Sequence, residues 1–491
     1  MKADVVVIGA GITGIAIARE LSKYSINTVV VEKRRDVAFG PPTKANTGII
    51  HAGYDDKPGT VKAQLCVKGN VLWRKIAEEL GAPFKEIGAL VVALREEEVP
   101  TLEELKKRGE VNGVKSLEVI YDRERLFQME PNLSRETVAA LYAPSAAVTS
   151  PYESAMIMAE NALKNGVRLL LETEVTGILG GSEVRRVITS KGLIETSFVV
   201  NAAGLEADKV SAMMGIDGFS ILPRKGEYYL FDKKLKGSVK HVLFPVPNPV
   251  SKGIVVTPTV DENILIGPNA NEVNDKNDLT TTWEGLDEVL DGALALVPML
   301  AEKKDKIITN FCGLRPEADT GDFIIKAYPE TKGFVNVAGI KSPGLTAAPA
   351  VAQTVVSLLR ESGLNLREKS DFNPRGRSYE SPIRELEADK IRALITQDHR
   401  YGRVVCRCEH VSEGDVVDAI KRGATTVDGV KLRTRAGMGR CQGGFCTHHV
   451  IKLLSRELDI PVEEVTKRGK GSEILPYKAK ELLLKGGDRH D

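Results

Sequence analysis

Four of the six cysteines in the chain lie close together near its end. Cys406 and Cys408 stand one residue apart in "RVVCRCEHV", and Cys441 and Cys446 follow in "GMGRCQGGFC". Four thiolates are a ligand set for a metal centre, either an iron–sulfur cluster or a structural zinc ion. Zinc modules usually separate paired cysteines by about two to four residues. The C-x-C pair therefore fits zinc poorly, and because four thiolates suit an iron–sulfur cluster as well, the spacing alone leaves both open.

A glycine pattern at the start of the chain predicts a second cofactor site. Gly9, Gly11 and Gly14 match G-x-G-x-x-G between the β-branched run 4–8 and a helical pattern. The first glycine makes a tight turn, the second lets backbone approach a pyrophosphate, and the third lets helix and strand pack closely. Glu32 ends the next β-branched run, where an acid accepts hydrogen bonds from ribose hydroxyls. Together they predict dinucleotide binding.

The order of elements predicts an α/β fold. Strand, glycine turn, helix and strand open a doubly wound, Rossmann-type domain. Helical and strand-like stretches then alternate, which predicts a mixed-sheet substrate lobe interleaved with it. We expect a two-lobed dinucleotide-binding domain over 1–365, a linker over 366–399, a small α-rich metal-binding domain over 400–465 and a polar tail over 466–491.

Bulk composition excludes several classes of function. The 68 basic residues balance 67 acidic ones, whereas nucleic-acid binding needs an excess of positive charge. No apolar run approaches the roughly 20 residues that span a bilayer. "MKADVVVIGAG" is interpreted as a strand and not as a signal peptide. Six cysteines in 491 residues are too few for a disulfide scaffold. We expect a cytoplasmic protein, and peripheral membrane contact through partners stays open.

Three further stretches resemble the FAD-dependent oxidoreductases of the D-amino-acid oxidase superfamily. They are "KANTGIIHAG" (44–53), "VVNAAG" (199–204) and "GIKSPGLTAAPA" (339–350), in the order that the family has. The resemblance implies FAD as the dinucleotide. A helix that begins in the third stretch would direct free N–H groups towards the flavin edge that gains negative charge on reduction. Besides the glycine turn and Glu32, the implied FAD contacts are Asn46, Thr47, Val175, Ala203, Gly204, Gly339, Gly344, Leu345 and Thr346.

The cysteine-containing segment resembles the 2Fe–2S module of the bacterioferritin-associated ferredoxin type. The resemblance lies in "CRCEHVSEGDVVDAI" and "KLRTRAGMGRCQGGFC". It implies that Cys406, Cys408, Cys441 and Cys446 hold one 2Fe–2S cluster. A flavin takes two electrons from a substrate, whereas such a cluster carries one at a time. We therefore expect a dehydrogenase that passes electrons to a partner subunit in a hetero-oligomer.

The flavin lobe joined to this module most resembles the large subunit of anaerobic glycerol-3-phosphate dehydrogenases. By that resemblance His51 is the candidate base for a substrate hydroxyl, and Arg315 binds the anionic group of the substrate. Lys341 would hold either the flavin or the substrate. The residues alone are equally consistent with His51 being a packed histidine without a catalytic role. Arg315 is equally readable as an ion-pair partner of Glu317 or Asp319, and Lys341 as a surface lysine.

One departure from that resemblance keeps other substrates open. Glycerol-3-phosphate enzymes tend to carry "HGG" after the flavin-side histidine, whereas "HAGYDDKPGTVKAQLCVKG" is closer to L-2-hydroxyglutarate oxidases. A 2-hydroxy acid is therefore the alternative substrate. A different class of function is a FAD and 2Fe–2S electron-transfer subunit of a multi-subunit opine or amine dehydrogenase.

Overall fold

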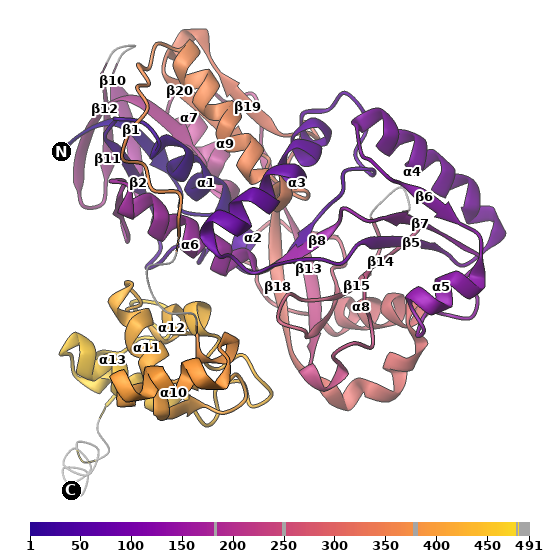
Figure 1. Cartoon of the computed structure of the whole chain (residues 1–491). Helices are drawn as coiled ribbons and strands as arrows, with labels where there is room; N and C mark the ends of the chain where they lie inside the picture. The colour runs from indigo at the N-terminus through magenta and orange to yellow at the C-terminus, as the bar shows by residue number, and fades with distance from the viewer. Residues whose placement is uncertain (181–183, 248–251, 377–381, 478–479, 481–491) are drawn as a thin grey trace, which may run out of the picture. The chain divides into compact units, whose positions relative to one another are not determined.

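The computed structural model describes residues 1–180, 184–247, 252–376, 382–477 and 480 (Figure 1). The chain forms two compact units, Met1–Arg377 (unit 1) and Ser378–Asp491 (unit 2). No described helix is both long and apolar enough to cross a membrane.

The first sheet of unit 1 has a parallel centre. Its strands are, in order, β20 (Phe334–Ala338), β12 (Gly192–Asn201), β1 (Lys2–Ile8), β2 (Thr28–Val31) and β9 (Arg168–Leu170). The antiparallel strands β10 (Val175–Gly180), β11 (Arg185–Thr189) and β19 (Ile324–Ala327) complete it. The second half of β1 and all of β2 are buried, as expected of strands covered on both faces.

The second sheet forms the other lobe of unit 1. Its order is β17 (Asn271–Glu272), β13 (Ile221–Phe231), β16 (Ile264–Gly267), β15 (Val255–Pro258), β14 (Val242–Pro245), β5 (Ala89–Ala93), β7 (Ala139–Ala143) and β6 (Glu118–Ile120). The long strand β18 (Ile307–Ala318) pairs with β13, and only β14 and β5 run parallel among the described pairs. Helices α4 (Val99–Asn112), α5 (Arg123–Met129) and α8 (Trp283–Leu296) lie on this lobe (Figure 1).

The two sheets are interleaved in sequence. The chain leaves the first sheet after β2, builds part of the second, returns for β9 to β12, and crosses back again before β19 and β20. Helix α1 (Ile12–Leu21) packs against α6 (Pro151–Lys164) and α9 (Gly344–Glu361), and α9 packs against α3 (Val61–Leu80). The predicted α/β fold with an interleaved mixed-sheet lobe is confirmed.

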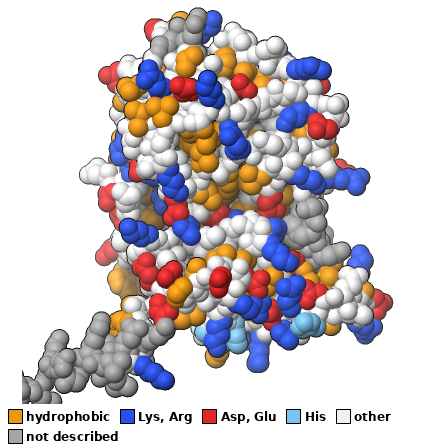
Figure 2. Space-filling model, turned by 90° about the vertical axis from the view of Figure 1, so that its left-hand side faces the viewer, with side chains coloured by type: hydrophobic (Ala, Val, Ile, Leu, Met, Phe, Trp, Pro, Cys, Tyr) orange, Lys and Arg blue, Asp and Glu red, His pale blue; other side chains and the backbone are white. Residues whose placement is uncertain are grey.

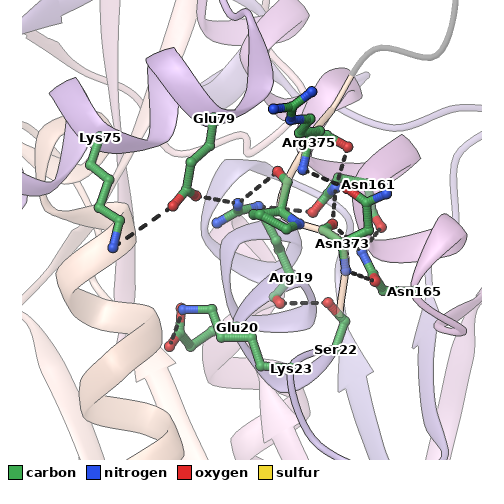
Figure 3. A network of polar contacts seen from close by, with 11 residues as sticks. Arg19, Glu20, Ser22, Lys23, Lys75, Glu79, Asn161, Asn165, Asn373 and Arg375 are labelled. Atoms are coloured by element: carbon green, nitrogen blue, oxygen red, sulfur yellow. Dashed lines mark hydrogen bonds and ion pairs between the residues drawn. The ribbon is translucent and has the colours of Figure 1, made fainter. Parts of the chain in front are cut away.

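The chain that follows α9 folds back onto these helices as an ordered strap, residues 366–376. Asn161 Nδ2 donates to the carbonyls of Asn373 and Arg375, each at 3.0 Å, and Asn165 Nδ2 donates to Asn373 at 2.9 Å (Figure 3). The guanidinium of Arg19, which pairs with Glu79 at 2.8 Å, also donates from Nε to Asn161 at 3.1 Å. The first part of the expected linker is therefore attached to unit 1.

Unit 2 is a small helical module. Its elements are α10 (Ala388–Gln397), β21 (Val404–Cys406), β22 (Val411–Ser412), α11 (Glu413–Lys421), α12 (Val427–Thr434) and α13 (Thr447–Leu458). Ser412 and Asp415 form a capping box that starts α11 directly after the first cysteine pair. Val416, Val430 and Leu454 meet in a core that also includes Cys406 and Cys446.

Two expected boundaries differ from the observed packing. The second part of the 366–399 segment contains α10, whose Leu394 is buried in unit 2. The expected tail begins with residues that pack on α12, because the amides of Val427 and Asp428 donate to the carbonyls of Thr466 and Lys467. A charged, Pro-rich composition does not reveal such backbone pairing. Most of 478–491 lies outside the described residues.

Asn161→Ala should destabilise unit 1 by about 1–3 kcal/mol, because the buried Nε of Arg19 and the carbonyl of Arg375 lose their partner, and the carbonyl of Asn373 keeps only Asn165. The free energy of unfolding can be measured by urea titration followed by circular dichroism. Asn310→Ala, at an exposed position of β18, is the control and should change it by less than about 0.5 kcal/mol. Equal stability of the two variants would show that the strap contributes nothing.

Candidate active site and cluster site

A single cleft in unit 1 brings most of the expected cofactor and substrate residues together. The residues that line it come from the β1–α1 turn, the end of β2, the segment 40–51, the end of β12, the strands β13 and β18, and the start of α9. Of the expected site residues it contains Gly9, Gly11, Glu32, Asn46, Thr47, His51, Ala203, Gly204, Arg315, Lys341, Gly344 and Leu345.

The β1–α1 turn forms a backbone cradle in this cleft. Gly9 has φ +104°, and a Cβ there would lie 2.5 Å from the carbonyl oxygen of Ala202. A Cβ on Gly14 would lie 2.0 Å from the carbonyl oxygen of Gly9, so only glycine lets α1 start this close to β1. Gly11 caps α1 without a side-chain hydrogen bond, which leaves the positive end of the helix towards the cleft. Such a turn fits a pyrophosphate.

Glu32 is fixed at the end of β2 beside this turn. Its carboxylate accepts hydrogen bonds from the backbone N–H groups of Ala10 (2.8 Å) and Arg34 (2.9 Å). The same side chain lines the cleft. An oriented carboxylate next to a glycine turn is the arrangement that holds a ribose diol, so the residues present fit the adenosine half of FAD.

The start of α9 forms the opposite end of the cleft. Pro343 caps the helix without a side-chain hydrogen bond, and Gly344 and Leu345 line the cleft. Thr346 lies behind them, and its Oγ1 accepts the backbone N–H of His51 at 2.9 Å. A Cβ on Gly69 of α3 would lie 2.0 Å from the carbonyl oxygen of Thr346, so α3 supports this turn at close range. The uncapped helix start suits a group that gains negative charge.

His51 is held as a neutral base. Burial lowers its pKa to about 3, and the positive charge of Lys252 lowers it further, whereas Asp55 acts in the opposite direction. The Nε2 atom lies 3.4 Å from the hydroxyl of Ser342, and the ring lies 5.9 Å from that of Phe244. The imidazole is therefore unprotonated at physiological pH.

Arg315 presents a guanidinium that no acidic side chain neutralises among the described residues. Its Nη2 donates to the carbonyls of Lys225 (3.0 Å) and Asn269 (2.5 Å), which fixes the plane of the group. Glu317, a possible partner from the sequence, instead pairs with Lys341 and with Arg224. Asp319, the other, accepts from the amide of Ser220. Burial lowers the pKa of Arg315, but an arginine stays charged. The cleft therefore offers a cation to an anionic group.

Lys341 and Lys252 also line the cleft, and each is paired with an acid. Lys341 is paired with Glu317, so its charge is balanced. Lys252 pairs with Asp55. Sequence reasoning missed Lys252, Asp55 and Tyr228. Asp55 lies four residues after His51, within the stretch that departs from "HGG", and that departure is the sequence signal for it. Nothing in the sequence around Lys252 marks it.

Three expected contacts shape the cleft from outside it, and one lies elsewhere. Gly14, Gly339 and Thr346 are not lining residues but support those that are. Gly339 has φ +67°, and a Cβ there would lie 2.7 Å from that of Ala318. Val175 does not reach the cleft, because it begins β10 and packs against the core of the first sheet.

In unit 2 the four cysteines form two close pairs. Cys408 Sγ lies 3.8 Å from Cys441 Sγ, and Cys406 hydrogen bonds with Cys446. A Cβ on Gly439 would lie 2.3 Å from that of Cys408, so the second loop passes directly over the first. Among the described residues, no group of three or more His, Cys, Asp or Glu side chains is arranged to hold a single metal ion. Two sulfur pairs suit two bridged irons better than one zinc ion.

In each pair one cysteine has a lowered pKa, Cys406 or Cys441, and its partner, Cys446 or Cys408, has a raised pKa. The hydrogen bond from Cys446 lowers the pKa of Cys406 to about 6, and the backbone N–H groups of Gly437, Glu409 and Cys408 act in the same direction. The backbone N–H of Phe445 likewise lowers the pKa of Cys441. Amide donors directed at cysteine sulfurs are a feature of iron–sulfur sites. The residues present therefore fit a 2Fe–2S cluster.

Comparison with known proteins agrees with both sites. Residues 4–358 match the family model described as FAD dependent oxidoreductase. The chain is a member of this family. Residues 404–456 match the model of the BFD-like [2Fe-2S] binding domain. FAD and a 2Fe–2S cluster are therefore the cofactors, as the sequence predicted, and the flavoenzyme class is confirmed.

Individual relatives of this flavoprotein differ in how much of the chain they match. A glycerol 3-phosphate dehydrogenase of Caloramator mitchellensis is 46% identical over 474 residues, 96% of this chain and 98% of the relative. An L-2-hydroxyglutarate dehydrogenase of Indibacter alkaliphilus is 29% identical over 72% of this chain and 98% of its own length. The FAD-bound structure of L-alpha-glycerophosphate oxidase from Mycoplasma pneumoniae superimposes with a TM-score of 0.73 at 31% identity, covering 78% of this chain and 99% of that chain.

Gly11→Val should abolish FAD binding, because the added side chain would fill the cradle and its Cβ would crowd Thr43 Oγ1, 3.1 Å away. We expect less than about a tenth of the FAD content of the native protein, measured as flavin released on denaturation. Gly218→Val is the control, since a Cβ there meets nothing within 4 Å. Full FAD content in the Gly11 variant would contradict this assignment.

Cys408→Ser should remove the 2Fe–2S cluster and leave the flavin in place. The native protein should contain about two irons and two acid-labile sulfides per chain, and the variant almost none, with flavin content unchanged. Cys312→Ser, in unit 1, is the control and should keep both cofactors. Stoichiometric zinc without sulfide in the native protein would overturn the cluster assignment.

Proposed function

We propose that this protein is a dehydrogenase that oxidises sn-glycerol 3-phosphate to dihydroxyacetone phosphate and passes the electrons through its 2Fe–2S cluster to a partner protein. The observation that carries the proposal is the pairing, in one cleft, of a neutral histidine with an arginine that no acid among the described residues neutralises. A secondary alcohol with an anionic group requires both.

His51 would take the proton of the substrate hydroxyl on Nε2, the atom that faces Ser342. The hydroxyl of Ser342 would keep the imidazole oriented. It would donate a hydrogen bond to the unprotonated Nε2 and accept one from Nε2 after the proton has been transferred. Bound FAD would accept the hydride from the carbon that carries this hydroxyl, so that the C–O bond becomes a carbonyl. The low pKa of His51 means that the acquired proton is released readily to solvent or to the next group.

Arg315 would bind the phosphate. Because three backbone carbonyls already fix its guanidinium, little side-chain entropy is lost when the substrate binds. Lys252 would add positive charge from the side of His51. We assign Lys341 to charge balance with Glu317 beside the flavin loop, and not to proton transfer, because its ammonium is already paired.

The dehydrogenase relative supports transfer to a partner and not to oxygen. Its similarity covers 96% of this chain and therefore extends through the cysteine-containing region. The glycerophosphate oxidase structure covers 78% of this chain, a share close in size to unit 1 alone. The cluster module thus accompanies the relative named as a dehydrogenase, which is consistent with a one-electron outlet.

A 2-hydroxy acid is the second candidate substrate. The "HAGYDD" stretch and the similarity to an L-2-hydroxyglutarate dehydrogenase favour it. Arg315 and Lys252 would bind a carboxylate as well as a phosphate, so the cleft by itself accommodates both substrates.

Anaerobic mixing with glycerol 3-phosphate should bleach the flavin, and L-2-hydroxyglutarate should not. His51→Gln should slow this reduction by roughly 10²–10⁴-fold while substrate still binds. Arg315→Leu should chiefly weaken substrate binding, by about 1.5–3 kcal/mol, because a charge-assisted contact is lost. Stopped-flow measurement of flavin absorbance against substrate concentration separates the two effects.

Arg186→Leu, at an exposed position of β11, is the matched control and should behave as the native protein. Bleaching by L-2-hydroxyglutarate alone would replace the substrate and keep the mechanism. If no small molecule bleaches the flavin until a partner subunit is added, the chain is an electron-transfer subunit.

A further inference from the structure

The cluster site of unit 2 is open to solvent on one side only. Cys406 and Cys446 are buried, whereas Cys408 and Cys441 are partly exposed. The sulfurs of the two exposed cysteines lie 3.8 Å apart, so they form one edge of the site. Because electron transfer weakens steeply with distance, an acceptor protein gains most by docking over this edge.

The two segments that carry the cysteines expose basic and no acidic side chains. Segments 403–412 and 436–456 contain a single acid, Glu409, which is buried and paired with Arg435 at 2.8 Å. Arg407 and Arg440, the residues that precede the two exposed cysteines, are themselves exposed. His448 and Lys452, one turn apart on α13, are exposed as well. Figure 2 shows Lys, Arg and His side chains on the part of the surface that unit 2 forms, with Asp and Glu side chains among them.

A large aromatic side chain projects from the middle of this surface. Phe445, directly before Cys446, is 80% exposed and lies between the exposed Gly444 and the start of α13. An exposed phenylalanine surrounded by charge is the pattern of a docking anchor in a protein interface. Its neighbour Gln442 is also exposed.

We propose that this cluster face, formed by Arg407, Arg440, Gln442, Phe445, His448 and Lys452, docks the electron-accepting partner, and that the partner is an acidic redox protein. Positive charge on the cluster face steers the partner, and Phe445 inserts into an apolar depression on it. Each docking event moves one electron from the reduced cluster to the acceptor, so oxidation of one substrate molecule reduces two acceptor molecules. The proposal rests on the proposed function only in requiring a protein acceptor.

The test measures binding first and electron transfer second, with the full-length protein carrying both cofactors. An acidic c-type cytochrome is the probe, and a basic c-type cytochrome is the matched control. Binding to the oxidised protein is titrated calorimetrically at about 10 mM and about 150 mM ionic strength, where the Debye length falls from about 30 Å to about 8 Å. We expect binding of the acidic probe only, weakened about ten-fold or more by salt.

Variants locate the interface. Arg407→Glu should weaken binding of the acidic cytochrome about ten-fold at low salt. Phe445→Ser should weaken it about five-fold or more at both ionic strengths, because the lost contact is apolar. Lys421→Glu, at the far end of α11, should change nothing. Iron and sulfide are measured in each variant. If Arg407→Glu lowers them, Lys452→Glu on α13 replaces it in the comparison.

The electron-transfer arm uses protein reduced with dithionite, so that no substrate is needed. The rate at which the acidic cytochrome reoxidises it should change in parallel with binding in each variant. A failure of glycerol 3-phosphate to bleach the flavin would leave this result unaffected. Equal affinity for the two cytochromes, or undiminished binding by the Arg407 and Lys452 variants, would overturn the proposal. Binding to phosphatidylserine vesicles in preference to the acidic cytochrome would overturn it as well, in favour of a membrane surface.

Discussion

The hydroxyl of Thr346 joins the two halves of the candidate active site. It accepts the backbone N–H of His51 and lies 3.4 Å from the carbonyl of Ile49, so it fixes β3 (Ile49–Ile50) to the first turn of α9 across nearly 300 residues of sequence. Trp73 of α3 donates to the carbonyls of Leu345 and Thr346 from the other side. His51 and the start of α9 are therefore fixed to each other, so that neither can shift without the other. Such coupling preserves the geometry on which hydride and proton removal depend.

Charge in the cleft serves two purposes at once. Lys252 is part of the positive wall that suits an anionic substrate, and the same charge, together with burial, keeps His51 neutral. The acids nearby do not neutralise the positive charge of Arg315, because Glu317 is paired with Lys341 and Arg224, and Asp55 is paired with Lys252. An anion that enters the cleft would offset the cations and raise the basicity of His51 when a substrate is present. The cleft thus favours proton transfer in the complex over protonation by solvent.

Local signals in the sequence predicted much of this structure. The β1–α1–β2 unit follows from β-branched runs and three glycines, and α3 begins after the Thr60 cap and ends at Gly81 in the left-handed region. Contacts between distant segments left no such signal. Lys252 reaches Asp55 across nearly 200 residues, and the strap at 366–376 is held by backbone carbonyls, which any sequence has. The cysteines were identifiable by type and spacing, but their pairing as Cys408 with Cys441 and Cys406 with Cys446 depends on the fold.

Interleaving of the two sheets has a consequence for biosynthesis. β1 is made first, but its neighbour β12 and the next strand, β20, emerge from the ribosome much later, and α9 later still. The flavin cleft therefore cannot close around FAD until most of unit 1 has been translated. Until then the edge of β1 that pairs with β12 is unpaired. Unit 2 has the opposite character, because its cysteines lie within about 40 residues of one another in a compact module of short helices. Insertion of the cluster can thus follow translation directly, while the flavin unit, although made earlier, is the slower half to mature.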